Sequence, residues 1–347
     1  MPARQVSLMG LCIALALSCP PAQACSTFAS KVNDEVVVGK NLDWFESTGA
    51  LIFSPAGRRK HGLYPDAEKL FHWRASYSSL TFVQHSLDHP LGGMNQKGLV
   101  VEILVGAKML SKPSEKRPNL NSVQFIQYLL DTFQNVKEVA THLPQRSREF
   151  AVVPLRGTPS VKYFVADKFG ESLVLEYDED NLRIYDSSPV PLTNNSPYEI
   201  SLAHLQSGAL SAELQTLGYL QASRSRKELK SAELVSWGFR GLNFLKGNTK
   251  ADARDFNAAW QVLYFPKQNR ISWRVDTRKE QTCHLSWTQN LWNLKRIIVH
   301  SLDCQPDEAW TDLTAYENES IFLRSAYSER DILSLQQLWD YFLSVTR

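Results

Sequence analysis

Cys25 is the residue whose sequence context points most directly to chemistry. It follows Ala22-Gln23-Ala24, a small-x-small site that closes a stretch typical of a secretory signal, with a positive start at Arg4 and an apolar core at 9–17. Cleavage after Ala24 makes Cys25 the first residue of the mature chain. A terminal cysteine carries a thiol nucleophile and, in its free α-amine, a general base.

The α-amine suits that role because an α-amino group titrates at about 7.7–8.0, below the value of about 8.5 for a free thiol. It can take the thiol proton and return it to a leaving amine, so no histidine is required. The junction also fits a lipid-modified anchor, although Ala22 stands where a lipoprotein signal normally has leucine or a similar residue. From the junction alone, both interpretations of Cys25 remain open.

The composition is that of a globular protein. Of 347 residues, 43% are hydrophobic and 21% are charged, and the net charge of +2 argues against a dedicated nucleic-acid-binding protein. After the signal, no run approaches the ~18 apolar residues of a membrane helix. We therefore predict a signal peptide at 1–24 and a single domain at 25–347, which is periplasmic or secreted.

Two further cysteines remain after the predicted cleavage, at positions 283 and 304. In an oxidising compartment they can form a disulfide, but spacing alone does not fix the pairing, and two buried thiols are the alternative. Cys25 is then the odd cysteine, as expected of a reactive thiol.

Hydrophobic periodicity predicts the elements that position Cys25. Alternating patterns predict a hairpin of strands at 26–32 and 36–44, which starts at Cys25, and a helix after an N-cap at Ser122, with one apolar face from Phe125 to Val136. Further strands are predicted at 80–84, 98–105, 161–166, 172–177, 182–185, 260–265 and 270–277, and helical segments within 199–245 and at 331–345. Strand pairs, then helices, then strand pairs indicate an α+β fold with packed antiparallel sheets.

Four stretches then form an ordered pattern: Cys25-Ser26-Thr27-Phe28, Gly39-Lys40-Asn41-Leu42-Asp43-Trp44, Gly93-Met94-Asn95-Gln96-Lys97-Gly98-Leu99, and Leu192-Thr193-Asn194 followed by Tyr198-Glu199. Together they resemble the choloylglycine hydrolase family of N-terminal nucleophile amidases, which includes penicillin V acylases and bile salt hydrolases. The resemblance implies a four-layer α/β/β/α sandwich and an amidase that cleaves linear amide C–N bonds through a thioester on Cys25. It implies no cofactor and no metal, and the close pair His85 and His89 lacks further ligands.

The resemblance also implies roles for individual residues. Asp43 is implied to orient the Cys25 amine, which the hairpin allows because the two residues lie at the free ends of its arms. Lys40 stands where the family usually has arginine, so it keeps the charge that favours a thiolate but loses the planar two-point contact. Asn194 is implied to donate to the oxyanion, a type of contact whose loss costs about 10²–10³ in rate.

Two assignments follow from the resemblance less directly. The second oxyanion donor falls near Val105, which can serve only through its backbone N–H. The family's bracing arginine matches Arg224, and Arg226 is a rival because the following phenylalanine is missing.

Glu102 lies within the apolar run 100–104, where a carboxylate needs a partner or solvent, and its placement stays open.

The substrates implied are acyl amides such as penicillin V, N-acyl homoserine lactones or conjugated bile salts, with the last least favoured. Aromatic residues at 44, 45, 53 and 73 are candidates to line an acyl pocket. Homo-oligomers are common in the family, so a homo-oligomer is also an expectation. The alternatives are a periplasmic lipoprotein or non-catalytic binding module anchored through Cys25, and a thiol hydrolase that uses a histidine.

Overall fold

The computed structural model describes residues 25–43, 48–63, 69–84, 87–108, 110, 112–154, 160–186, 191–194, 197–207, 217, 219–221, 231–246, 258–275, 281–287, 289–304, 310–324 and 343–344. The predicted signal at 1–24 and most of the predicted helix at 331–345 lie outside these residues. The assignment of 25–347 to a single domain stays a prediction.

The first sheet contains Cys25 at its margin. Its six antiparallel strands follow the order β14 (Leu192–Thr193), β1 (Ser26–Val32), β2 (Glu35–Asp43), β15 (Ala258–Phe265), β16 (Arg270–Val275) and β17 (Cys283–Ser286). The predicted hairpin of β1 and β2 is confirmed, with Ser26 opposite Asn41 and Val32 opposite Glu35. Because β14 pairs with the start of β1, the segment before Asn194 lies beside Cys25.

The second sheet has nine antiparallel strands. Their order is β13 (Asn181–Asp186), β12 (Ser172–Asp178), β11 (Val161–Ala166), β8 (Val100–Val105), β7 (Pro90–Asn95), β6 (Ser79–Val83), β3 (Ala50–Ser54), β18 (Ile298–Ser301) and β19 (Thr311–Asp312). Two short pairs accompany it, β9 (Asn119–Asn121) with β10 (Ala151–Val153), and β4 (Arg59–His61) with β5 (His72–Arg74). The predicted strands of this sheet are confirmed within two residues, whereas the sequence patterns did not predict β3, β7, β18 and β19.

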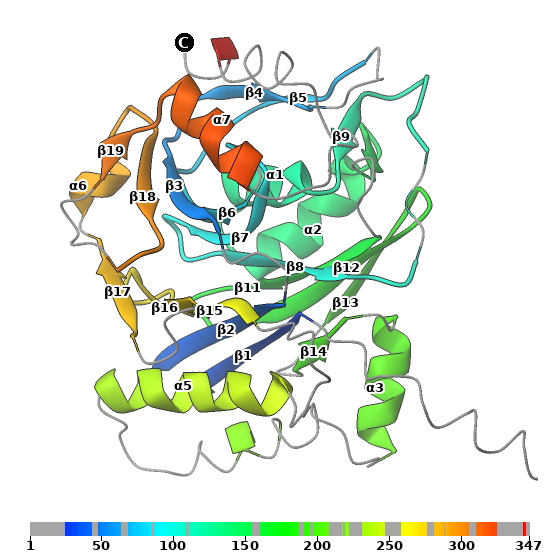
Figure 1. The fold of residues 1–347 in the computed structure, drawn as a ribbon. Helices are drawn as coiled ribbons and strands as arrows, with labels where there is room; N and C mark the ends of the chain where they lie inside the picture. The colour runs from blue at the N-terminus through cyan, green and yellow to red at the C-terminus, as the bar shows by residue number, and fades with distance from the viewer. Residues whose placement is uncertain are drawn as a thin grey trace, which may run out of the picture.

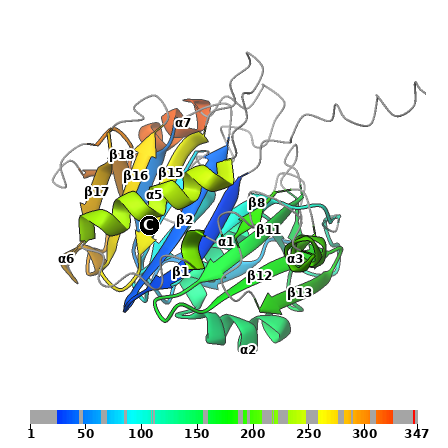
Figure 2. The same ribbon diagram turned by 90° about the horizontal axis from the view of Figure 1, so that it is seen from below.

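The two sheets pack face to face, and helices cover both outer faces (Figures 1 and 2). α5 (Ser231–Lys246) crosses β1, β2 and β15, while α1 (Gln124–Thr132) packs on β7 and β8 and is followed by α2 (Val136–Arg146). One apolar core lies between the sheets, and two others lie beneath α5 and beneath α1. The predicted four-layer α/β/β/α sandwich is confirmed. The described residues also contain the helices α3 (Tyr198–Gln206), α6 (Gln289–Trp292) and α7 (Ala315–Arg324).

The helix predicted after Ser122 differs in two respects. Its N-cap is Val123 rather than Ser122, and Asn121 Oδ1 accepts from the N–H groups of Val123 and Gln124 at 3.0 and 2.7 Å. The predicted apolar face is divided, because Phe133 is extended (φ −112°, ψ 149°) and ends α1. Asn121 is the better acceptor here because its longer side chain reaches past the turn at 122–123.

The stretch Gly93–Leu99 spans the end of β7 and the tight turn that leads to β8. Asn95 Oδ1 accepts from the N–H groups of Lys97 and Leu99 at 3.0 and 3.1 Å, while its Nδ2 donates to the carbonyls of Leu130 and Phe133 at 2.8 and 2.7 Å. Gly98 has φ +83°, which a residue with a side chain adopts only with strain. This motif is therefore structural: it fixes the β7–β8 turn to the end of α1.

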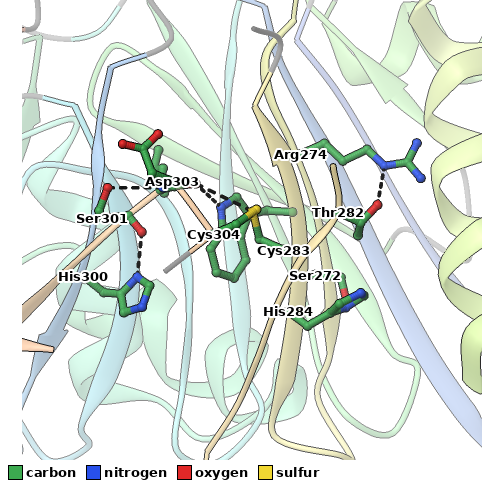
Figure 3. The surroundings of a disulfide bond; sticks show 11 residues. Ser272, Arg274, Thr282, Cys283, His284, His300, Ser301, Asp303 and Cys304 are labelled. Atoms are coloured by element: carbon green, nitrogen blue, oxygen red, sulfur yellow. Dashed lines mark hydrogen bonds between the residues drawn. A yellow bond between two sulfur atoms is a disulfide. The ribbon is translucent and has the colours of Figure 1, made fainter. Parts of the chain in front are cut away.

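A disulfide joins the two sheets at the edge formed by β17 (Figure 3). Cys283 begins β17 and Cys304 follows β18, and their Cα atoms are 4.8 Å apart. Trp273 Nε1 also donates across to the Leu302 carbonyl at 2.9 Å. Of the two alternatives for these cysteines, the structure contains the bridge.

Candidate active site

Cys25 lies at the entrance to β1, with 5% of its surface exposed. Its Sγ is 3.9 Å from the backbone carbonyl of Asp43, which accepts a weak hydrogen bond from the thiol. The antiparallel register explains the contact, because the first residue of one arm meets the last residue of the other. The structure thus brings together Cys25 and Asp43.

Lys40 is buried between the sheets, with 1% exposed surface. On β2 it shares a face with Val38 and Leu42, which belong to the inter-sheet core. Its Nζ donates to the Ile103 carbonyl and lies 3.9 Å from Glu102 Oε2. Lys40 is therefore a cation inside the sandwich, and its charge acts on the Cys25 thiol.

Asn194 is positioned by Val105. The Val105 N–H donates to Asn194 Oδ1 at 2.8 Å, which fixes the orientation of the amide and leaves Nδ2 as its donor. The Asn194 amide is one of the groups that lower the pKa of the Cys25 thiol. The role of the Val105 N–H as an oxyanion donor stays a prediction, because in this structure that N–H is bonded to Asn194.

The pKa of the Cys25 thiol is raised by these surroundings. Burial is the largest cause, and the Asp43 carboxylate adds to it. Lys40 is the strongest opposing influence, followed by the Asp43 backbone and the Asn194 amide. The thiol is thus held mainly in its protonated form, and a nearby base has to remove its proton.

Glu102 lies between the two sheets, in the same layer as Lys40. It is 1% exposed and faces Lys40 from β8, so its position is interior rather than at a sheet edge. Burial raises its pKa to about 7, while Lys40 and the Tyr264 hydroxyl act in the opposite direction. The sequence contained the signal for this site, a carboxylate in an apolar strand, but not its partner.

A polar network on the other face of β2 was not predicted from the sequence. Asn41 Nδ2 donates to Ser26 Oγ at 2.7 Å and to the Leu242 carbonyl of α5 at 2.9 Å. Gln261 Nε2 bridges Asn41 and Asn243, at 3.0 Å to each Oδ1. This network fixes Ser26, the residue after Cys25, to β2, β15 and α5. The sequence did contain a signal for this network, because neighbouring residues of a strand point to opposite faces and Asn41 is therefore on the other face of β2 from Lys40.

The remaining predicted residues have different outcomes. Arg224, Arg226 and the aromatic residues at 44 and 45 lie outside the described residues. Phe53 belongs to the same inter-sheet core as Cys25, whereas Trp73 packs beneath α1 on the opposite face of the nine-stranded sheet and donates to Asp131 Oδ2 at 2.8 Å. The prediction that Trp73 lines an acyl pocket is therefore wrong.

His89 belongs to a separate buried region. Its Nε2 is 3.3 Å from Asn121 Nδ2, and burial lowers its pKa to about 4. Lys60 lies in a buried ion-pair cluster, 2.8 Å from Asp88 Oδ1 and 3.1 Å from Asp131 Oδ2. These residues brace the outer face of the nine-stranded sheet.

The assembled groups are suited to acyl transfer. A thiol can attack a carbonyl carbon, a buried cation can stabilise the thiolate, and an amide N–H with fixed orientation can donate to the oxyanion. The family model of linear amide C–N hydrolases, choloylglycine hydrolase family, matches residues 25–270.

The chain belongs to the choloylglycine hydrolase family. Penicillin V acylase of Pectobacterium atrosepticum is 25% identical over 202 residues, which is 53% of this chain and 52% of that protein, so the match spans about half of that relative. A bile salt hydrolase/transferase of Lactiplantibacillus plantarum is 27% identical over 252 residues, covering 69% of this chain and 70% of that protein.

Solved structures of the same family share the fold. Penicillin V acylase from Agrobacterium tumefaciens superposes with a TM-score of 0.70 at 17% identity, covering 84% of this chain and 98% of that chain. A variant of conjugated bile acid hydrolase from Clostridium perfringens gives 0.63 at 16% identity, with coverages of 81% and 98%. In this member of the choloylglycine hydrolase family, β17, β18 and the disulfide lie beyond the matched residues.

Proposed function

We propose that this protein hydrolyses linear amide C–N bonds with Cys25 as an N-terminal nucleophile. The observation that carries the proposal is the convergence of Lys40, Asp43 and Asn194 on the buried thiol of Cys25. Family membership supports it, and the matched residues begin at Cys25.

The reaction proceeds through a thioester. The α-amine of Cys25 takes the thiol proton, the sulfur bonds to the acyl carbon, and Asn194 Nδ2 donates to the oxygen that becomes negative. The amine passes its proton to the leaving nitrogen, and the C–N bond breaks. A water molecule then attacks the thioester, giving its proton to the α-amine, and the carbon–sulfur bond breaks to release the carboxylic acid. The thiol recovers its proton.

The neighbouring residues assist these reaction steps. Lys40 stabilises the thiolate, and Asp43 is proposed to hold the ammonium form of the α-amine after proton transfer. The Val105 N–H acts by orienting Asn194, and Arg224 is proposed to brace the network.

We propose that the substrates are acyl amides with an apolar acyl group, with penicillin V and N-acyl homoserine lactones ahead of conjugated bile salts. The named relatives include a penicillin V acylase and a bile salt hydrolase/transferase, which supports this range.

We also propose export to the periplasm or medium and homo-oligomer formation. The Cys283–Cys304 disulfide supports export, because disulfides persist in oxidising compartments. None of the helices in the described parts of the chain is long and apolar enough to cross a membrane.

The test compares the processed protein with two variants. Expression of the full chain, intact-mass analysis and a panel of the three acyl amides should show a mature chain that starts at Cys25 and releases free amine. Cys25→Ser should lose turnover, and one alanine inserted before Cys25 should abolish it while leaving the fold intact. A diacylglyceryl adduct on Cys25 would establish the lipoprotein alternative instead. Full activity of the alanine-extended chain would favour a histidine-dependent thiol hydrolase.

A further inference from the structure

We propose that Glu102 is a positioning residue for this reaction, which controls through Lys40 how much positive charge acts on the Cys25 sulfur. The inference rests on the proposed function, in which Cys25 is the nucleophile. Glu102 does not contact the reacting atoms in this mechanism, and its effect is transmitted by the one ammonium group it shares with the thiol.

The fold provides a defined place for the Glu102 carboxylate. Glu102 lies in the middle of β8, opposite Gly92 of β7 and Phe164 of β11. A Cβ atom at position 92 would overlap the carboxylate, so glycine is needed there to make room for it. The carboxylate is held between two sheets, away from solvent.

Lys40 connects this carboxylate to the nucleophile. Its Nζ lies 3.9 Å from Glu102 Oε2, and the same ammonium is the strongest influence that lowers the pKa of the Cys25 thiol. Charges interact more strongly in such a layer than in water, because the surrounding side chains are apolar. An ionised Glu102 therefore neutralises part of the field that Lys40 exerts on the sulfur.

The carboxylate is poorly bonded for an ionised group. Its Oε1 has no hydrogen-bond partner among the described residues. The Tyr264 hydroxyl faces the carboxylate and only partly opposes the effect of burial on its pKa. Burial raises the Glu102 pKa to about 7, so both forms are populated near neutral pH. When Glu102 is protonated, the full charge of Lys40 acts on Cys25.

Other charged groups face this layer and must be distinguished from Glu102. From β1 and β2 these are Cys25, with its thiol and the α-amine of the proposed mature chain, Lys40 and Asp43. From β15 it is Tyr264, and from β11 and β12 they are Lys162 and Glu176. Lys162 and Glu176 are directly opposite each other in register. Glu176 is also buried, at 2% exposed, and accepts from the Tyr198 N–H at 3.1 Å. It is therefore a matched control for Glu102.

The test measures alkylation of Cys25 by iodoacetamide between pH 5.5 and 8.5, followed by mass spectrometry of the peptide that contains Cys25. Glu102→Gln should alkylate at the wild-type rate at pH 5.5 and at least about threefold faster at pH 8, where only the wild type carries the extra negative charge. In a Lys40→Met background, Glu102→Gln should have no effect, because the buried carboxylate without its cation stays protonated. Glu176→Gln should match the wild type throughout.

Equal rates for Glu102→Gln and the wild type at pH 8 would overturn the proposal. An equal acceleration by Glu176→Gln, or an effect that persists without Lys40, would also overturn it. If Glu102→Gln fails to fold, the wild-type profile is compared with that of Lys40→Met. A step near pH 7 that the wild type shows and Lys40→Met lacks supports the inference. A step present in both proteins, as titration of the Cys25 α-amine would give, or no such step in the wild type, contradicts it. Alkylation needs no substrate, so absent amide turnover would overturn the proposed function without affecting this result.

Discussion

The backbone N–H of Val105 donates to the side-chain oxygen of Asn194 at 2.8 Å, across 89 positions of the chain. Val105 ends β8 of the nine-stranded sheet, and Asn194 follows β14 of the six-stranded sheet. The contact joins the sheets next to Cys25 and determines which end of the amide can donate. The geometry of the proposed oxyanion site therefore depends on how the two sheets are packed.

Asn194→Ala should lower kcat by about 10²–10³, because the oxyanion loses its side-chain donor. Asn194→Asp should be at least as damaging, since a carboxylate adds negative charge where negative charge develops. The measurement is steady-state turnover of the acyl amide hydrolysed best by the wild type. Asn181→Ala, at an exposed asparagine of β13, is the control and should keep wild-type kcat. A wild-type kcat for Asn194→Ala would exclude the assigned role.

Glu102→Gln should change how stability depends on pH. The folded-state pKa of Glu102 is about 7, above its ordinary value of 4.5, so the folded protein binds more protons than the unfolded chain between these values. In the wild type, this group therefore lowers stability as pH rises from about 4.5 to 7, by a total on the order of 3 kcal/mol. Urea unfolding at pH 5 and pH 8 should show a smaller loss in Glu102→Gln. Parallel losses in both proteins would contradict the expectation.

Asn95→Ala should destabilise the protein by about 2–4 kcal/mol, because the turn loses two acceptor contacts and the carbonyls of Leu130 and Phe133 lose a buried donor. Chemical denaturation gives the free energy of unfolding. Asn95→Asp is the informative partner, since it keeps the contacts to Lys97 and Leu99 but lacks the two N–H donors. An Asn95→Ala protein as stable as the wild type would show that the turn does not depend on this side chain.

Reduction of the Cys283–Cys304 disulfide should lower the free energy of unfolding by about 3 kcal/mol, the value expected for a closed loop of this length, since the cysteines are separated by 21 residues. Urea denaturation with and without reductant measures the change, and the double substitution to serine should reproduce it. Cys25→Ser is the control and should respond to reductant as the wild type does. A midpoint unchanged by reductant in the wild type would mean that the bridge does not stabilise this fold.

Local patterns predicted the parts of the fold that are continuous in sequence. The hairpin of β1 and β2 was readable because apolar residues alternate on either side of a polar turn, and the same held for β11, β12 and β13. Strands such as β3 and β7 lacked a clear alternation, since β3 is buried throughout and β7 contains two glycines. The end of α1 was missed because distant Asn95 bonds its terminal carbonyls.

The sequence by itself determined the family, the fold class and the candidate residues Cys25, Lys40, Asp43 and Asn194, because those signals lie in short contiguous stretches. Only the tertiary structure decided that Lys40 points inward to Glu102, and that Val105 orients Asn194. Residues on different sheets meet only when the two apolar faces pack together, and the burial produced by that packing sets their pKa values.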